Sequence, residues 1–137
     1  MRILAIETAT NVASTALVDD TGILGEISNN TGKTHSQRLM PLIASLLEES
    51  DLKLKDLDGI AVSGGPGSFT GLRIGMATGK ALAYAAKLPL ISVSTLDSLA
   101  LNLKGSPSLI CPILNARKNE VYTAIYRVDL KGIIAQV

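Results

Sequence analysis

Clusters of apolar residues separated by turn residues begin the chain and predict three short strands. Residues 2–8 and 12–18 are rich in β-branched and other apolar side chains, and a turn at 19–22 leads into a third strand near 23–28. Connections this short join neighbouring antiparallel strands, so we expect the three strands to form a meander.

The spacing of apolar residues then changes to that of a helix. Leucine and isoleucine occupy positions 39, 42, 43, 46 and 47, the three-and-four spacing of an amphipathic helix. Thr34 followed by Gln37 is typical of a capping box at its start, with Ser36 as an alternative N-cap. Pro41 is expected to kink this helix or to loosen its first turn.

Strands and helices alternate through the middle of the chain. A strand is predicted at 59–63, a helix from about Thr70 to Ala86, a strand at 90–93 and a helix at 94–103. The element order is therefore βββαβαβα, and helices that link successive strands imply parallel crossovers beside the meander. We predict an α/β domain with a mixed sheet over residues 1–105.

Residues 106–137 do not continue this alternation. Two strands are predicted at 109–114 and 120–128, joined by residues 115–119, and a turn at 129–132 leads into residues 133–137. We interpret this segment as the first strands of a second domain of the same type that is incomplete.

Composition narrows the class of function. Lys plus Arg is 13 and Asp plus Glu is 12, so there is no basic excess to neutralise a nucleic-acid backbone, and aromatic side chains are too few for base stacking. Cys111 is the only cysteine, which excludes an intramolecular disulfide and favours a reducing compartment. No apolar stretch has the length of a membrane helix, so we expect a cytoplasmic protein without membrane contact.

The glycine-rich loop at 64–71 is the main candidate for chemistry. Glycines let a backbone approach a ligand and free N–H groups at a helix start attract anions, whereas a tight turn without a ligand is the other interpretation. No Gly-Lys-Ser/Thr ends the loop, so it is not a P-loop. Glu7, at the end of the first strand, either faces a metal-bound water or is an ordinary strand-end carboxylate. The candidate nucleotide or phosphate contacts are Glu7, Gly65, Gly67, Ser68 and Thr70.

The first two predicted helices carry a candidate partner surface. Glycine at 71, 75 and 79, followed by Ala83, predicts close packing of the second helix on its own sheet. The apolar arc of the first helix spans roughly 200°, about twice what a core stripe requires, so a partner is expected to cover part of it. A solvated face is the alternative for the second helix. The candidate interface residues are Met40, Ala44, Leu47, Arg73, Met76, Ala77, Lys80 and Tyr84.

His35 is the only histidine in the chain. One imidazole without a nearby Cys or second His does not make a dedicated metal site, so we predict a role at the start of the helix.

Four segments of the chain resemble the TsaB (YeaZ) family, which belongs to the glycoprotease-like, actin-like ATPase superfamily with a ribonuclease H-like fold. They are residues 3–10, 35–37, 65–75 and 115–122. The resemblance implies a non-catalytic partner of the paralogue TsaD in threonylcarbamoyladenosine modification of tRNA. It further implies a TsaE-like ATPase as a third component, a homodimer through the first two helices when the chain is alone, and only indirect contact with tRNA.

The same resemblance bears on catalysis and cofactors. TsaD has an HxxxH metal motif, and Thr95 and Leu99 occupy the two histidine positions here; neither side chain replaces imidazole as a metal ligand. We therefore predict no catalytic residue, no metal site and no required cofactor, with ATP or ADP contact left open in the complex. Family members often carry Asp at the positions of Glu7 and Asn115 and run longer. The alternatives are an ATP-dependent phosphotransferase, a glycoprotease-like metallopeptidase and a purely self-associating structural protein.

Overall fold

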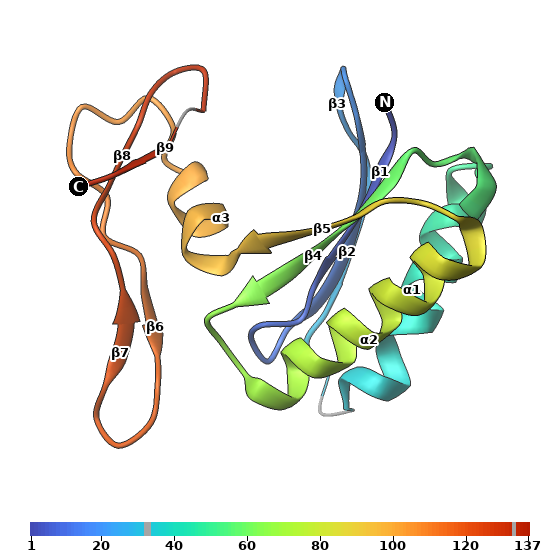
Figure 1. The fold of residues 1–137 in the computed structure, drawn as a ribbon, viewed down its shortest axis with the longest axis horizontal. Helices are drawn as coiled ribbons and strands as arrows, with labels where there is room; N and C mark the ends of the chain where they lie inside the picture. Colours follow the sequence, from blue (N-terminus) through green and yellow to red (C-terminus); the bar gives the residue numbers. More distant parts are fainter. Residues whose placement is uncertain (32–33, 133) are drawn as a thin grey trace.

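A mixed five-stranded sheet forms the larger part of the computed structural model, which describes residues 1–31, 34–132 and 134–137. Its strand order is β3-β2-β1-β4-β5 (Figure 1). The first three strands are antiparallel neighbours, and β4 and β5 run parallel to β1. This topology confirms the predicted α/β class and the meander with parallel crossovers. The strands are β1 (Ile3–Glu7), β2 (Ala13–Asp19), β3 (Gly22–Asn29), β4 (Gly59–Gly65) and β5 (Leu90–Ser94).

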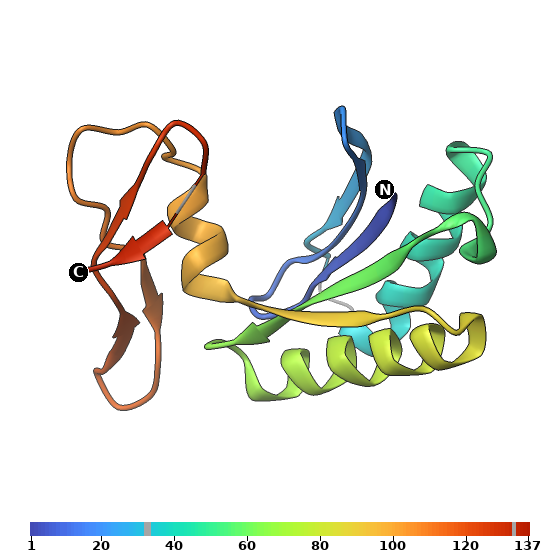
Figure 2. The same cartoon turned by 45° about the horizontal axis from the view of Figure 1, so that its top comes forward.

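Two helices cover one face of this sheet (Figure 2). α1 (His35–Glu49) packs on β2 and β3, α2 (Phe69–Ala86) packs on β4, and a short 3-10 helix, η1 (Leu54–Asp56), precedes β4. Thr34 is the N-cap of α1, but its side chain accepts no backbone N–H and lies 3.0 Å from the Ser36 hydroxyl instead. The predicted capping box is therefore wrong, because the two hydroxyls bond each other. Pro41 lies inside α1.

The core lies between the sheet and these two helices. Leu4 and Ile6 of β1 meet Leu39, Ile43 and Leu46 of α1, and all five side chains are buried. The small-residue face of α2 makes the closest approach to the sheet, as predicted. A Cβ on Gly75 would come within 3.0 Å of the Thr8 hydroxyl, and one on Gly79 within 3.0 Å of the Val62 side chain; Gly71 and Ala83 are also buried.

A second, smaller cluster forms around α3 (Thr95–Leu101), which follows β5. Leu96 and Ala100 of this helix pack with Ile110, Tyr126 and Val128. The hairpin predicted around residues 115–119 is present as β6 (Ile113–Asn115) and β7 (Val121–Thr123), and β8 (Tyr126–Val128) pairs with β9 (Ile134–Gln136).

The strand predicted at 120–128 is interrupted at residues 124–125. Its first half is the exposed strand β7, which pairs with β6. In its second half, β8, Tyr126 and Val128 pack inward against α3, and β8 pairs with β9. The strand predicted at 109–114 is also shorter than expected, because only residues 113–115 enter the ladder and Ile110 makes an isolated bridge to Tyr126. The division of the chain at residue 105 stays a prediction. Within the described residues, no helix is both long and apolar enough to span a bilayer.

Tyr126 offers a test of the smaller cluster. Its ring is only 3% exposed and its hydroxyl donates to Asp97 Oδ1 at 2.8 Å; burial, with help from that bond, raises the pKa of the phenol. Tyr126→Phe is expected to cost about 1 kcal/mol of unfolding free energy. Because the folded-state pKa lies above the unfolded value of about 10, the buried neutral phenol stabilises the fold fully below that pH. This stabilisation is lost as pH rises through the folded pKa.

Urea unfolding between neutral and alkaline pH measures both effects. The variant is expected to lose less stability than the parent across the alkaline range. Tyr122→Phe is the matched control, because that tyrosine is exposed and belongs to neither core cluster. Equal alkaline losses in the parent and in Tyr126→Phe would contradict this role of the buried phenol.

Candidate functional site

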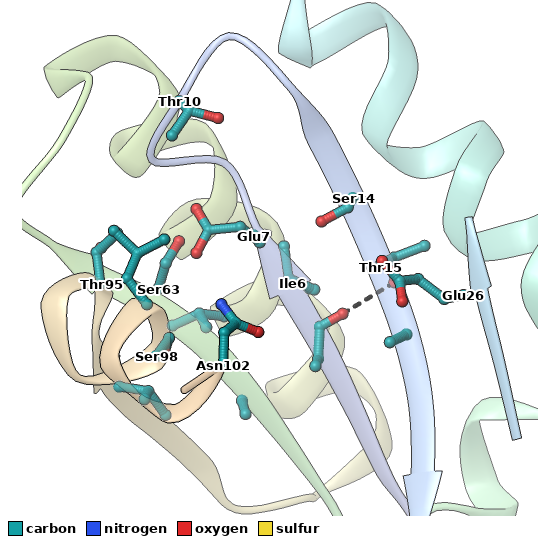
Figure 3. Close-up of a pocket in the computed structure, with 16 residues that line it drawn as sticks. Ile6, Glu7, Thr10, Ser14, Thr15, Glu26, Ser63, Thr95, Ser98 and Asn102 are labelled. Carbon is teal, nitrogen blue, oxygen red and sulfur yellow. Dashed lines mark hydrogen bonds between the residues drawn. The ribbon is translucent and has the colours of Figure 1, made fainter. Parts of the chain in front are cut away.

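The face of the sheet opposite α1 and α2 carries a pocket of about 460 Å³. Successive residues of a strand face opposite sides, so Leu4 and Ile6 enter the core while Ala5 and Glu7 face the pocket. Ala16 of β2 and Ala61 of β4 continue this floor of small side chains, and α3 forms a wall (Figure 3). We call this the open-face pocket.

Polar side chains surround Glu7 in the open-face pocket (Figure 3). The Glu7 carboxylate accepts the backbone N–H of Ala9, so it is held by the turn that follows its own strand. The Ser63 hydroxyl accepts the N–H of Thr8 at 3.3 Å. Thr10, Ser14, Ser98 and Asn102 also line the pocket. This lining offers hydroxyl and amide groups and two carboxylates, Glu7 and Glu26.

Thr95 and Leu99 of α3 both line the open-face pocket. Thr95 is buried and its hydroxyl has no hydrogen-bond partner among the described residues. The positions that the resemblance aligns with metal-binding histidines therefore face a cavity, with side chains that do not ligate metals. In the described part of the chain, no group of three or more His, Cys, Asp or Glu side chains is placed to hold a metal ion.

The glycine-rich loop is docked on the turn between β1 and β2. The Ser68 N–H donates to the carbonyl of Ala9 at 2.6 Å, and a Cβ on Gly67 would come within 3.0 Å of the Ala9 backbone. Gly65 has φ of 102°, which glycine adopts readily. Ser68 is the N-cap of α2 and accepts the N–H of Gly71 at 3.2 Å. Close packing thus accounts for Gly67, and the positive φ accounts for Gly65, without a ligand.

The five candidate phosphate contacts do not converge on one cavity. Glu7 lines the open-face pocket, whereas Ser68 and Thr70 line a second pocket at the starts of α1 and α2. Gly65 and Gly67 lie in the loop between β4 and α2. Their contact with a nucleotide stays a prediction. The hydroxyl and amide groups of Ser14, Ser63, Ser98 and Asn102 were not predicted from the sequence. The small residues at positions 5, 16 and 61 were the signal for this face of the sheet.

The candidate partner residues lie on α1 and α2, two helices that contact each other, and most of them are exposed. Tyr84 is 89% exposed and Met40 47%, and Ala44, Ala77 and Lys80 are also exposed. Arg73 is exposed and its guanidinium lies 5.2 Å from the centroid of the Phe69 ring, an exposed aromatic that the sequence analysis missed. Leu47 and Met76 are half-buried and pack against the main core, so they contribute only their edges to this face.

His35 is the first residue of α1, which confirms its predicted place at the helix start. Its Nε2 lies 2.8 Å from the carbonyl oxygen of Thr10 and its Nδ1 lies 3.3 Å from an Arg38 nitrogen. A guanidinium only donates, so Nδ1 accepts and Nε2 carries the hydrogen. The ring thus joins the β1–β2 turn to Arg38.

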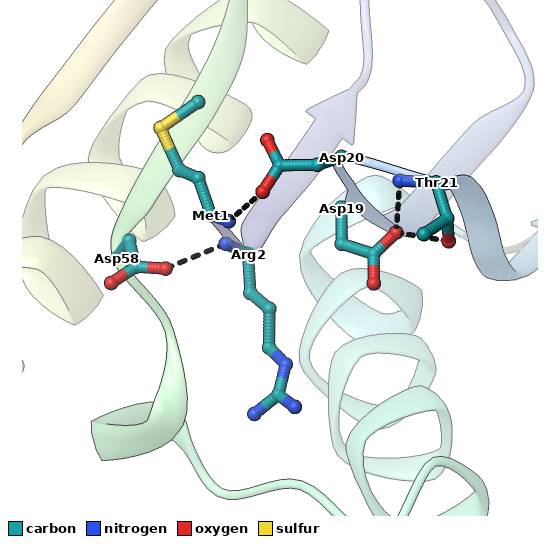
Figure 4. Close-up of polar contacts among 6 residues, drawn as sticks. All are labelled: Met1, Arg2, Asp19, Asp20, Thr21 and Asp58. Atoms are coloured by element: carbon teal, nitrogen blue, oxygen red, sulfur yellow. Dashed lines mark hydrogen bonds and ion pairs between the residues drawn. The ribbon is translucent and has the colours of Figure 1, made fainter.

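A charged cluster lies at the opposite end of β1 (Figure 4), and none of its residues lines either pocket. The terminal ammonium of Met1 pairs with Asp20, which raises the pKa of that amine, and the Arg2 N–H donates to Asp58 Oδ2 at 2.6 Å. The Thr21 hydroxyl bonds Asp19 and lowers the pKa of its carboxyl group. Met1, Asp20 and Asp58 are exposed, so this cluster contributes little to stability and instead positions the start of β1.

The strand order β3-β2-β1-β4-β5, with α1 and α2 on one face, gives the chain a ribonuclease H-like fold. RuvC of Thermus thermophilus matches 74% of the chain with a TM-score of 0.50 at 15% identity. The Lmo2764 protein of Listeria monocytogenes matches 75% with a TM-score of 0.51 at 19% identity. At these identities the matches show the fold alone.

Closer relatives show the family. The family model described as TsaD, tRNA N6-adenosine threonylcarbamoyltransferase, matches residues 7–135. The chain is 40% identical over its full length to the tRNA threonylcarbamoyladenosine biosynthesis protein TsaB of Bacillus subtilis, and 41% identical over 97% of its length to TsaB of Escherichia coli. YeaZ from Pseudomonas aeruginosa superposes on 99% of the chain with a TM-score of 0.88 at 32% identity. The chain belongs to this glycoprotease-like family, on its TsaB (YeaZ) branch.

The match covers only part of each relative. The chain spans 59% of the Bacillus protein and 58% of the Escherichia protein, and 63% of the Pseudomonas YeaZ chain.

Proposed function

We propose that this chain takes part in the biosynthesis of threonylcarbamoyladenosine in tRNA as a non-catalytic partner of a TsaD-like protein. The observation that carries the proposal is the exposed face across α1 and α2, on a chain whose whole length is similar to TsaB. Aromatic, methionine and arginine side chains are enriched in protein interfaces, and Tyr84, Met40 and Arg73 supply one of each.

The described side chains favour a binding role over catalysis. Thr95 and Leu99 leave the wall of the open-face pocket without metal ligands, and the Glu7 carboxylate is bound to its own turn. We propose that the chain requires no cofactor of its own, and that any contact with ATP or ADP arises in the complex, through the open-face pocket. A net charge of +1 supports indirect contact with tRNA.

Assembly is the property to test. Size-exclusion chromatography with light scattering measures the mass of the chain alone and after mixing with TsaD of the same organism. We expect a homodimer that is replaced by a mixed complex, to which a TsaE-like ATPase then adds. A folded chain that remains unchanged by TsaD at concentrations well above micromolar would contradict the partner role.

A further inference from the structure

The outer side of α2 carries a row of exposed side chains with one sign of charge. Five exposed residues follow one another at spacings of three and four positions, so they lie on one side of the helix and extend over about 22 Å. They are Phe69, Arg73, Ala77, Lys80 and Tyr84. The helix contains no acidic residue. We call this set the α2 stripe.

The two cations of the α2 stripe have no counter-ion in the described part of the chain. Arg73 makes a cation–π contact with the Phe69 ring, and neither Arg73 nor Lys80 forms an ion pair among the described residues. Both ends of the stripe are exposed aromatic side chains, Phe69 and Tyr84. Exposed aromatics that flank cations are typical of a protein interface rather than of a solvated helix face.

The middle of the α2 stripe is low. Ala77 is its central member, between the long side chains of Arg73 and Lys80. A small residue there lets a second helix approach to the separation of packed helices, about 8–10 Å. The stripe is therefore suited to a partner helix that lies along α2, with carboxylates opposite the two cations.

A second copy of this chain cannot supply those carboxylates from its own α2. The midpoint between Arg73 and Lys80 is also the midpoint between Phe69 and Tyr84, at residues 76–77. A two-fold contact of α2 with α2 about that point would pair each Phe69 with Tyr84 of the second copy. The same contact would place each Arg73 against Lys80 of the second copy, and like charges across an interface are unfavourable.

The neighbouring helix relieves only part of this repulsion. Met40, Ala44 and Glu48 share one side of α1, so each copy offers one carboxylate there, in the last turn of the helix. The other acid of α1, Glu49, lies on a different side and accepts the Ser45 hydroxyl at 2.9 Å. Each copy thus brings two cations of the stripe and one carboxylate, and a contact between copies keeps a net positive charge.

We propose that the α2 stripe selects an acidic helix of a partner protein over a second copy of this chain. Opposite charges favour the mixed contact and like charges weaken the homodimer, so the homodimer yields to the mixed complex. The proposal rests on the proposed partner role where it takes a TsaD-like protein as the source of the acidic helix. The repulsion between copies depends on this chain alone.

Salt distinguishes the two contacts. Sedimentation equilibrium of the chain alone measures the Kd of the homodimer, and calorimetry with TsaD of the same organism measures the Kd of the mixed complex. Both are compared at about 50 mM and about 300 mM sodium chloride, because added salt screens exposed charges. Higher salt is expected to tighten the homodimer several-fold and to weaken the mixed complex several-fold.

Lys80→Glu reverses one charge of the α2 stripe at an exposed position, so the fold is expected to be kept. The new carboxylate would face Arg73 of a second copy, and the homodimer is expected to tighten at least about tenfold. It would also face the carboxylates of the partner helix, and the mixed complex is expected to weaken at least about tenfold. Lys104→Glu is the matched control; it makes the same change at an exposed lysine after α3, away from α1 and α2, and is expected to change neither Kd (Figure 1).

A homodimer that Lys80→Glu does not tighten, or a mixed complex that it does not weaken, would overturn the proposal. Weaker binding in both contacts would show a shared surface without selection by charge. If the parent chain does not bind TsaD at all, the partner role fails, and self-association still decides the repulsion. A monomeric parent whose Lys80→Glu variant dimerises then supports the repulsion, and a variant that remains monomeric overturns it.

Discussion

Replacing Gly75 by alanine is expected to lower the free energy of unfolding by about 2 kcal/mol. Alanine is the better helix former by about 1 kcal/mol, so helix propensity alone predicts the opposite sign. The new methyl group would lie within 3.0 Å of the Thr8 hydroxyl, which is itself buried at the end of β1. Either the helix moves off the sheet or the Thr8 side chain leaves its position, and both changes disturb the core.

Thr8→Ala provides the rescue for this clash. The Thr8 hydroxyl has no hydrogen-bond partner among the residues that the structure describes, so its removal is expected to be nearly neutral, and the double variant should recover most of the loss. Gly71→Ala is the matched control, because its Cβ would meet the backbone carbonyl of Thr8, which no side-chain change removes. Urea unfolding of Gly75→Ala, Gly71→Ala and Thr8→Ala, and of each glycine variant combined with Thr8→Ala, measures the coupling. Rescue of both glycine variants, or of neither, would contradict this packing.

On the proposed partner role, Tyr84→Ala is expected to weaken binding to a TsaD-like protein by at least about 2 kcal/mol, roughly thirtyfold in Kd. Tyr84 is 89% exposed in the chain alone, so its truncation is expected to change the stability of the monomer by no more than about 0.5 kcal/mol. A loss of affinity without a loss of stability would locate the interface on the outer side of α2. Titration of each variant with TsaD by calorimetry measures the affinity.

Tyr122→Ala is the control for this loss, because it truncates an exposed tyrosine on β7, away from α1 and α2. It is expected to keep the parental affinity. Equal affinities for Tyr84→Ala and the parent would show that the outer side of α2 lies outside the interface. Met76 is unsuitable for this test, because it packs partly against the core and its replacement would also change stability.

The sequence by itself determined the order and type of the elements from β1 to α3. The spacing of apolar residues distinguishes strand from helix locally, and the turn residues at 19–22 place the β2–β3 hairpin. The glycines at 71, 75 and 79 also indicated their packing correctly, because a repeat of four residues marks one side of a helix. These inferences need only neighbours along the chain.

Only the tertiary structure decided which distant residues meet. Arg38, Asn11 and Thr70 belong to three separate segments of the chain. They line one pocket because α1 and α2 begin at the same end of the sheet. The core contacts of Met76 and the inward turn of Tyr126 were likewise settled by packing against neighbouring elements. The periodicity of a sequence indicates which side of an element is apolar. Contacts across the fold decide which elements cover that side and which charges stay unpaired.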